Sequence, residues 1–341
     1  MRLLVTGGAG FIGSNFTRMA LSRRPGWSVT VLDKLTYAGR RENLQEVEND
    51  TRFRFVHGDI CDRETVEDAI RDCDAVVNFA AETHVDRSIE DSYSFVRTDI
   101  EGVRVLLEAF RRGERRMFLQ ISTDEVYGSV EEGRSGEEHL LCPRSPYAAS
   151  KAGGELLAMS YWTTYGVPVV VTRASNNYGP YQYPEKLIPL FLTNAMDGEQ
   201  LPLYGDGLNR RDWLFVDDHC EALIRVLEDS TPGKVYNIGA GQELTNRQVT
   251  DAIISATGAS PDLVRYIEDR PGHDRRYALD VSLIERELGW KAETGFQEGL
   301  SRTAEWYRRN RSWWETIKSG EFRTYYQSMY SDRLGRSGGE Q

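Results

Sequence analysis

The stretch "RLLVTGGAGFIG", residues 2–13, joins a short apolar run to three regularly spaced glycines. Gly7, Gly10 and Gly13 form a GxxGxxG pattern, and Asp33 closes the next apolar run. Such glycines permit a tight turn and a close approach of backbone to a pyrophosphate, which a helix N-terminus then faces. A carboxylate at Asp33 would accept hydrogen bonds from ribose hydroxyls and repel a 2′-phosphate. The stretch therefore predicts a dinucleotide site that prefers NAD to NADP, and the alternative is a glycine-rich turn without function.

Short apolar, β-branched runs recur through the first half of the chain, separated by stretches that suit helices. Continuous apolar character is what strands buried on both faces of a parallel sheet need. Between them, residues 99–112 carry apolar side chains at the i, i+3, i+4, i+7 spacing of an amphipathic helix. We predict an α/β fold, a Rossmann-type doubly wound parallel sheet with a smaller mixed α/β substrate-binding lobe. The expected strands are residues 2–6, 28–33, 53–59, 75–81, 117–122 and 167–173.

The pattern changes after residue 174 to loop-rich sequence with shorter helices and strands. We assign residues 1–174 to an NAD-binding Rossmann domain and residues 175–332 mainly to a lobe that binds the substrate. The run 234–241 has the character of another buried strand, so segments near 212–241 are expected to return partly to the first domain. The last residues, "RSGGEQ", contain no apolar side chain, and 333–341 is expected to be a disordered tail.

Composition excludes several classes of function. The 341 residues carry a formal net charge of −11, which argues against nucleic acid or an anionic membrane as partner. The four cysteines form no CxxC pair and the five histidines no HExxH motif, so neither a metal site nor a disulfide framework is expected. No leader segment precedes the first strand, and no apolar run approaches the roughly 20 residues of a membrane span. We expect a soluble, cytoplasmic protein.

A tyrosine and a lysine four residues apart follow the fifth expected strand, in "YAASK". On a helix, Tyr147 and Lys151 would share one face, and the ammonium could stabilise a phenolate. The tyrosine could then act as a base near neutral pH. Chance places many such pairs on solvated helix faces, but a preceding dinucleotide pattern and a strand that ends in Ser/Thr favour a catalytic pair.

Two adjacent acids, Asp124 and Glu125, stand where the fifth expected strand should end, in "ISTDEVYG" (121–128). Two carboxyl groups close together in a partly desolvated cleft tend to have different pKa values, because the charge of one opposes ionisation of the other. Such a pair could supply one acid and one base. The alternative is that Asp124 caps the following turn and Glu125 faces solvent.

Together, "GGAGFIG", "STDEVYG" and "YAASK" resemble the extended short-chain dehydrogenase/reductase family. Longer motifs, which extend over nearly the whole chain, resemble the dTDP-glucose 4,6-dehydratases within it. The resemblance implies tightly bound NAD, dTDP-glucose as the substrate, and a homodimer formed through helices of the nucleotide lobe. The longer motifs are "DKLTYAG" (33–39), "AAETHVDRSI" (80–89), "SNNYGPYQYPEKLIPLF" (175–191), "YGDGLNRRDWLFVDDH" (204–219) and "DRPGHDRRYALD" (269–280).

The resemblance also implies a mechanism. Tyr147, helped by Lys151 and Thr123, would take the proton of the glucosyl 4-hydroxyl while a hydride leaves C4 for NAD⁺. Glu125 would then remove the C5 proton, and Asp124, in its protonated form, would donate to the departing C6 hydroxyl. Return of the hydride to C6 and of a proton to C5 would give a 4-keto-6-deoxy sugar with no net change in the cofactor.

The same resemblance implies two sets of binding residues. Two cofactor segments, 58–60 and 79–81, also lie at the carboxyl ends of expected strands, where ligands bind in open α/β sheets, and the alternative is that they are ordinary strand-to-helix turns. Alone, each charged member of the second set would more often be a surface charge or an ion-pair partner, and His84 a structural histidine. The cofactor set is Gly7, Gly10, Phe11, Ile12, Gly13, Asp33, Lys34, Thr36, Asp59, Ile60, Phe79, Ala80, Ala81, Thr98, Tyr147 and Lys151. The substrate set is Thr83, His84, Asn177, Lys186, Leu187, Pro202, Tyr204, Arg211, Asn246, Arg270 and His273.

One position departs from the family pattern, which usually has asparagine where this chain has Asp99. If Asp99 lies near Lys151, its charge could compete with the tyrosinate for the ammonium; if it faces the edge of the sheet, the change is harmless. The sequence leaves both possibilities open.

Other functions are compatible with the same fold. A UDP-sugar 4-epimerase or a UDP-glucuronate decarboxylase would share the Tyr/Lys pair and retained NAD but lack the Asp-Glu pair. A catalytically silent NAD-binding or scaffold protein is the non-enzyme alternative. The choice of thymidine over uridine rests on the resemblance alone, and the pathway served is not encoded in these residues.

Overall fold

The structure is a computed structural model that describes residues 1–269, 272–320, 322–324 and 326. Two expectations lie outside these residues: the substrate contact of Arg270 and the tail at 333–341.

A seven-stranded sheet forms the larger part of the molecule. Its strands run in the order β10-β6-β5-β4-β1-β2-β3, and every neighbouring pair is parallel. All six expected strands are present, and the run at 234–241 supplies the seventh. The doubly wound parallel sheet is therefore confirmed. The strands are β1 (Arg2–Thr6), β2 (Ser28–Asp33), β3 (Phe53–His57), β4 (Ala75–Asn78), β5 (Met117–Thr123), β6 (Val169–Ala174) and β10 (Val235–Ile238).

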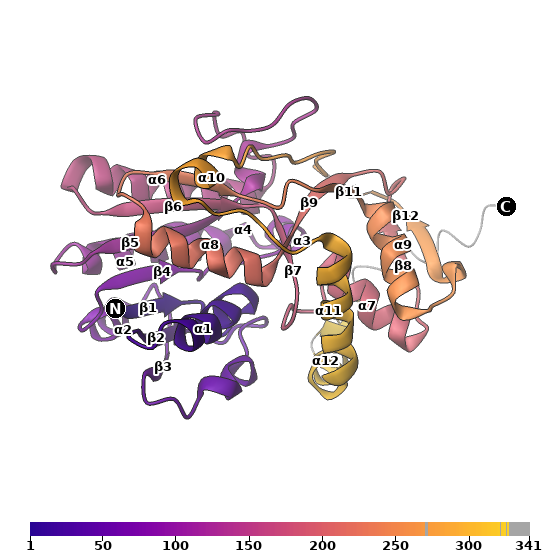
Figure 1. Ribbon diagram of the computed structural model, residues 1–341, viewed down its shortest axis with the longest axis horizontal. Coiled ribbons are helices and arrows are strands. Elements are labelled where there is room, and N and C mark those ends of the chain that lie inside the picture. Colours follow the sequence, from indigo (N-terminus) through magenta and orange to yellow (C-terminus); the bar gives the residue numbers. More distant parts are fainter. Residues whose placement is uncertain (270–271, 321, 325, 327–341) are drawn as a thin grey trace.

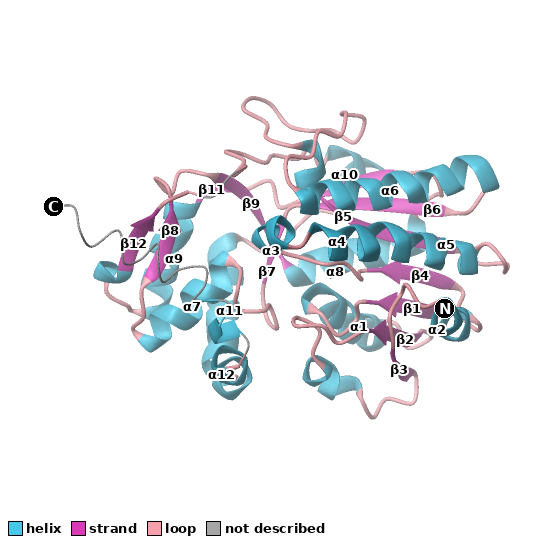
Figure 2. Cartoon of the chain, turned by 180° about the vertical axis from the view of Figure 1, so that it is seen from behind, coloured by secondary structure: helices cyan, strands magenta, loops and turns pink. Residues whose placement is uncertain are grey.

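Helices bury both faces of this sheet. Leu3 and Val5 of β1 belong to the apolar core on one face and Leu4 to the core on the other, which is why the strands are continuously apolar. The first face carries α1 (Phe11–Arg23), α8 (Val216–Asp229) and α10 (Ser282–Leu288) (Figure 1). The second carries α2 (Arg63–Ile70), α5 (Val103–Phe110) and α6 (Pro146–Tyr165) (Figure 2). Short connecting helices are η1 (Arg41–Val47), α3 (Val85–Glu90), α4 (Ser92–Val96), η3 (Asp124–Tyr127) and η4 (Pro261–Leu263).

The helix expected at 99–112 differs from the observed structure in its first part. A π-helical segment, η2 (Arg97–Gly102), precedes α5. This wider turn brings the Asp99 carbonyl against α6 at Gly154, where a Cβ atom would collide with that carbonyl oxygen. The Asp99 side chain is also held, since it accepts hydrogen bonds from the Glu82 N–H and the Ser150 hydroxyl. These tertiary contacts override the simple 3.6-residue period.

A smaller mixed α/β lobe, also as expected, packs at the carboxyl end of the sheet. In its three-stranded sheet, β9 pairs in parallel with β7 and antiparallel with β11, while β8 and β12 form a parallel pair. It has its own apolar core, which includes Tyr178, Trp213 and Tyr307. Its elements are β7 (Asn176–Tyr178), α7 (Leu187–Asp197), β8 (Leu201–Tyr204), β9 (Arg210–Phe215), β11 (Glu243–Thr245), α9 (Asn246–Thr257), β12 (Val264–Ile267), α11 (Phe296–Arg309) and α12 (Arg311–Ser319).

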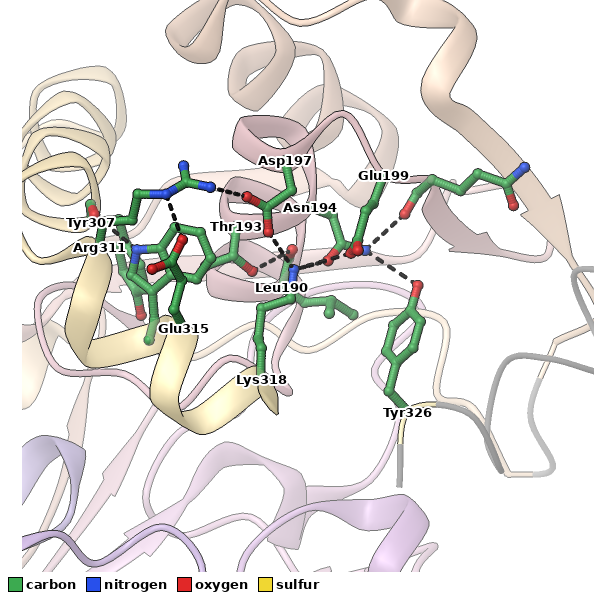
Figure 3. Close-up of polar contacts among 12 residues, drawn as sticks. Leu190, Thr193, Asn194, Asp197, Glu199, Tyr307, Arg311, Glu315, Lys318 and Tyr326 are labelled. Atoms are coloured by element: carbon green, nitrogen blue, oxygen red, sulfur yellow. Dashed lines mark hydrogen bonds and ion pairs between the residues drawn. The ribbon is translucent and has the colours of Figure 1, made fainter. Parts of the chain in front are cut away.

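Helix α12 is tied to the C-terminal end of α7 by ionic contacts (Figure 3). The Lys318 ammonium donates to the side chains of Asn194, Asp197 and Glu199, each at 3.1 Å, and Arg311 also pairs with Asp197. A carboxylate in the last turn of a helix opposes the helix dipole, so these cations offset an unfavourable placement of Asp197. The contacts fix the helix whose first residues reach the cavities described below.

Within the described residues, none of the helices combines the length and apolar character that a membrane span requires.

We predict that Lys318→Met lowers the free energy of unfolding by about 2 kcal/mol, because hydrogen bonds to charged groups contribute roughly 1.5–3 kcal/mol. Methionine keeps the apolar stem near the Trp314 ring, so the loss reports the polar contacts. Urea denaturation measures the effect. Arg309→Met, which removes an exposed ion pair with Glu305, is the control and should change stability little. Equal losses in the two variants would contradict a specific role for Lys318.

Candidate active site

Two cavities meet where the sheet faces the smaller lobe, and they share part of their walls. Every predicted cofactor residue lines one of them, which we call the cofactor cavity. Every predicted substrate residue other than Arg270 lines the other, the substrate cavity. Thr123, Asp124 and Glu125 also line the substrate cavity, whereas Tyr147 belongs to both. Ligands of open α/β sheets bind at this carboxyl edge.

The glycine loop closes one end of the cofactor cavity. Gly7 has a φ of +67°, and a Cβ atom there would lie 2.6 Å from the Ala80 nitrogen. A side chain at Gly7 would thus separate the ends of β1 and β4. Helix α1 begins after Gly10 with neither a side-chain cap nor an acidic residue in its first turn, which suits an anionic group. This loop fits a dinucleotide pyrophosphate.

Asp33 has a second role that the motif alone does not reveal. Its carboxylate accepts backbone hydrogen bonds from Ala9 and Leu35, both at 2.8 Å, and so ties the glycine loop to the end of β2. Burial raises the pKa of Asp33, and the two N–H donors act in the opposite direction. The carboxylate lines the cofactor cavity, as a ribose-binding acid would. Lys34, beside it, pairs with Asp59 at 2.9 Å.

The end of β5 places the two acids in different environments. The Thr123 hydroxyl, rather than Asp124, caps the short helix η3, because it accepts a hydrogen bond from the Glu125 N–H. Asp124 is only 3% exposed, and its Oδ2 atom has no hydrogen-bond partner among the described residues. Glu125 is half-buried. The alternative in which Asp124 serves as a cap is therefore wrong.

The environment of Asp124 favours its protonated form. Burial, followed by the charge of Glu125, raises the pKa of Asp124 to about 8, although Arg211 acts in the opposite direction. At neutral pH such a carboxyl holds its proton. The pair can therefore present a proton donor beside a second carboxyl group in one cavity.

Tyr147 and Lys151 lie on α6, which begins at Pro146 after a Ser145 cap. The Lys151 ammonium is buried and donates to the Ile121 carbonyl at 2.7 Å. Burial, followed by the charges of Glu125 and Asp99, raises the pKa of Tyr147 well above its usual value, while the Thr123 hydroxyl acts in the opposite direction. The phenol thus needs a cationic neighbour to ionise.

Asp99 lies on the Lys151 side of α6, not at the edge of the sheet. It is buried, accepts from Ser150 at 2.6 Å, and burial raises its pKa to about 6, while the charge of Lys151 lowers it. Burial lowers the pKa of Lys151 and raises that of Tyr147, while the charge of Asp99 acts to raise both. Of the two possibilities that the sequence left open, this geometry corresponds to the one in which Asp99 lies near Lys151.

The far end of the substrate cavity is cationic and aromatic. Arg211 of β9 is buried, donates to the Asp274 carbonyl at 2.8 Å and lies 4.3 Å from the centre of the Tyr277 ring. His273 pairs with Asp269 at 2.6 Å and packs edge-on against Tyr204. Such a wall can hold a phosphate and a flat base. Lys186, Leu187, Pro202 and Asn246 complete this part of the lining.

Thr83 and His84 lie at the opposite end, after β4. The Thr83 carbonyl accepts from Tyr37, and His84 has a φ of +82°, a conformation that non-glycine residues rarely adopt. A non-glycine residue keeps such a backbone conformation only where its surroundings hold it. The backbone of His84 is therefore constrained at the cavity wall.

Several lining residues were missed by the sequence reasoning. Gln182, His219 and Tyr277 all line the substrate cavity, and all fall within motifs quoted above. The motifs mark the correct segments, but only the fold shows which side chains point inward. Among the described residues, no group of three or more His, Cys, Asp or Glu could hold a metal ion.

The model of the GDP-mannose 4,6 dehydratase family matches residues 4–303. The chain belongs to this family. It is 56% identical over 323 residues to a dTDP-glucose 4,6-dehydratase of Streptomyces niveus, a match that covers 94% of this chain and 96% of the relative. Its resemblance to dTDP-glucose 4,6-dehydratases is thereby confirmed.

Solved structures of related proteins have the same fold as this chain. DesIV, a dTDP-glucose 4,6-dehydratase from Streptomyces venezuelae with NAD and TYD bound, is 52% identical with a TM-score of 0.91, covering 93% of this chain and 100% of that one. A UDP-glucose 4-epimerase from Thermus thermophilus in complex with NAD is 35% identical with a TM-score of 0.84, covering 91% and 100%. The fold is thus shared with epimerases, while the identity is higher with the dehydratase.

We predict that Asp99→Asn moves the acid limb of the activity–pH profile to lower pH. The Asp99 carboxylate, with a pKa of about 6, is ionised above that pH and then opposes ionisation of Tyr147, whereas asparagine carries no charge. Rates measured across the pH range with saturating substrate test this. An unchanged profile would show that Asp99 does not tune the tyrosine.

Proposed function

We propose that the chain converts dTDP-glucose into dTDP-4-keto-6-deoxyglucose, as a hydro-lyase with tightly bound NAD. The observation that carries this proposal is the pair Asp124 and Glu125 in a cavity that also contains Tyr147. Epimerisation needs no acid–base pair for the loss of water, so the pair favours dehydration over the epimerase or decarboxylase alternatives. Sequence identity above 50% to dTDP-glucose 4,6-dehydratases supports the same choice.

The residues present fit NAD, because the glycine loop accepts a pyrophosphate and Asp33 stands where a ribose would lie. Bound NAD⁺ supplies a positively charged hydride acceptor for C4, and in reduced form the donor for C6. Tyr147, which lines the same cavity as Thr123 and lies on the same helix as Lys151, takes the proton of the 4-hydroxyl. Because the hydride taken from C4 would be returned to C6, the cofactor would not be consumed.

We assign the elimination of water to Asp124 and Glu125, at the end of β5. A ketone at C4 acidifies the proton at C5, and Glu125 removes it. Asp124, whose pKa is raised to about 8, delivers its proton to the departing 6-hydroxyl. After the hydride reaches C6, a proton from solvent is restored at C5. Arg211, His273, Asn246 and Lys186 line the same cavity and would bind the nucleotide and diphosphate. Substrate bound in this direction would have its glucosyl group beside the acids.

The division of the chain follows from this assignment. We assign residues 1–174, with returning segments near 212–241, to NAD and residues 175–332 mainly to the sugar nucleotide. The pairing of β10 with β6 supports the return of the chain to the first domain. The four cysteines, all among the described residues, are free, which supports a reducing cytoplasmic location.

A turnover experiment in deuterated water tests the activity. Incubation with dTDP-glucose should give a product that has lost water and carries one solvent deuterium at C5, as found by mass spectrometry. In a parallel incubation, UDP-glucose should give little dehydrated product. Formation of the 4-epimer from UDP-glucose, with no 4-keto-6-deoxy product from dTDP-glucose, would overturn the proposal.

We predict that Glu125→Gln retains C4 oxidation but dehydrates at least about 100-fold more slowly, since general bases contribute roughly 10²–10⁴ in rate. Bound NADH should accumulate after substrate is added, as measured by its absorbance. Glu132→Gln, in an exposed loop, is the matched control. Dehydration at the parent rate would show that Glu125 is not the base.

We further propose that the chain forms a homodimer through α3, α4 and α6. Exposed apolar side chains gather on these helices, which pack against one another: Ile89, Tyr93, Val96 and Leu156. Tyr93 is 74% exposed, unusual for so large an aromatic residue. A second copy of the same surface would bury them.

Light scattering after size-exclusion chromatography should show a dimer for the parent and a monomer for Tyr93→Asp, because a buried charge would destabilise the interface. Tyr266→Asp, on β12 of the smaller lobe, is the control and should remain dimeric. A monomeric parent, or an unchanged mass for Tyr93→Asp, would contradict this interface.

A further inference from the structure

Gln182, in the loop between β7 and α7, lies in the wall that the two cavities share. It is only 7% exposed. Its Nε2 atom donates to the Asn177 carbonyl at 2.9 Å, whereas its Oε1 atom has no hydrogen-bond partner among the described residues. Because a carbonyl can only accept, the nitrogen must face Asn177, and this fixes the direction of the amide. The Oε1 atom of Gln182 is therefore an acceptor that receives no hydrogen bond from the described residues.

An unused buried acceptor is costly. Leaving such a group without a donor costs about 1–3 kcal/mol, and the great majority of buried polar atoms are paired. Gln182 is not alone, since His219 donates through Nδ1 to the Asn177 side-chain oxygen at 2.8 Å and leaves its Nε2 atom unpartnered. Asn177 is thus held on both sides by residues that each keep one acceptor. A cavity wall with two such acceptors is suited to a ligand that donates hydrogen bonds.

Two C-terminal helices, α11 and α12, restrain the backbone at Gln182. The hydroxyl of Tyr307, a fully buried residue of α11, donates to the Gln182 backbone carbonyl. The Tyr307 carbonyl in turn accepts from the Trp314 indole of α12 at 2.9 Å. Helix α12 is anchored to α7 through Lys318 (Figure 3). The loop that carries Gln182 is therefore restrained by α11 and α12, whose residues do not line either cavity.

We propose that the Gln182 side-chain oxygen accepts a hydrogen bond from a bound ligand where the two cavities meet, and that Tyr307 is a positioning residue for it. The donor is an N–H or O–H group of uncharged polar type. The carboxamide of the nicotinamide and a hydroxyl of the glucosyl group are the two sources of such a donor. This inference rests on the proposed function, because it takes its two ligands from there.

Gln182→Met tests the proposal, since methionine has similar length and no comparable acceptor. Three constants are measured on purified protein: the NAD dissociation constant of cofactor-stripped protein, the KM for dTDP-glucose, and the dissociation constant of dTDP, which lacks the glucosyl group. If the cofactor is the donor, the NAD constant rises about tenfold, equivalent to roughly 1.4 kcal/mol, and the other two stay constant. If the glucosyl group is the donor, only the KM rises.

Changes of less than twofold in both the NAD constant and the KM would overturn the proposal. A parent protein that binds NAD but does not turn over dTDP-glucose would instead count against the proposed function, so the two failures are distinguishable. The NAD dissociation constant can be measured in either case.

A second pair of variants separates positioning from stability. Tyr307→Phe removes only the hydroxyl that holds Gln182, and should change the same constant as Gln182→Met by about threefold. Tyr178→Phe is the matched control, because this fully buried tyrosine also donates to a backbone carbonyl, that of Phe296, but does not contact Gln182. Equal effects of both variants on the ligand constants would show that Tyr307 has a structural role only.

Discussion

The desolvation of one carboxyl group, that of Asp124, is the constraint on which the site depends. The parallel sheet brings the end of β5 into the interior, so Asp124 leaves water while Glu125, one residue on, stays half-buried. Burial, followed by the charge of Glu125, thus raises the pKa of Asp124, in the way that environment tunes one of two paired acids in other enzymes. The loss of water from a sugar requires a donor and an acceptor of protons at adjacent carbons, and we propose Asp124 and Glu125 for these two roles.

The two lobes make complementary contributions to the same cavity. The sheet provides rigid strand ends, where β1, β4 and β5 present the glycine loop, Thr83 and the acids. The smaller lobe provides the cationic wall around Arg211, and its C-terminal helices restrain the loop of Gln182 and the helix that follows Lys186. A reaction with three chemical steps on one bound sugar needs this rigidity, because the acids and the tyrosine must each reach their atom without release of the intermediate.

Much of the fold could be predicted from sequence because the relevant signals are local. Interior strands of a doubly wound sheet are buried on both faces, so their apolar character is continuous and easily recognised. All seven strands were found, including the edge strand β3, which is only partly buried. The π-helical turn at Arg97–Gly102 could not be predicted, since it depends on contacts with Gly154 and Ser150 far along the chain. The location of Asp99 beside Lys151 follows from the same turn. The backbone contacts of Asp33 and the inward direction of Gln182 likewise depend on tertiary structure, which a motif does not encode.

The claim that burial keeps Asp124 protonated can be measured directly by infrared difference spectroscopy of the NAD-bound enzyme against Asp124→Asn. A carbonyl stretch of a protonated carboxylic acid should be present at neutral pH in the parent only, and should disappear as the pH rises through about 8. If the parent shows no such band at neutral pH, Asp124 is ionised there and cannot be the acid of the elimination.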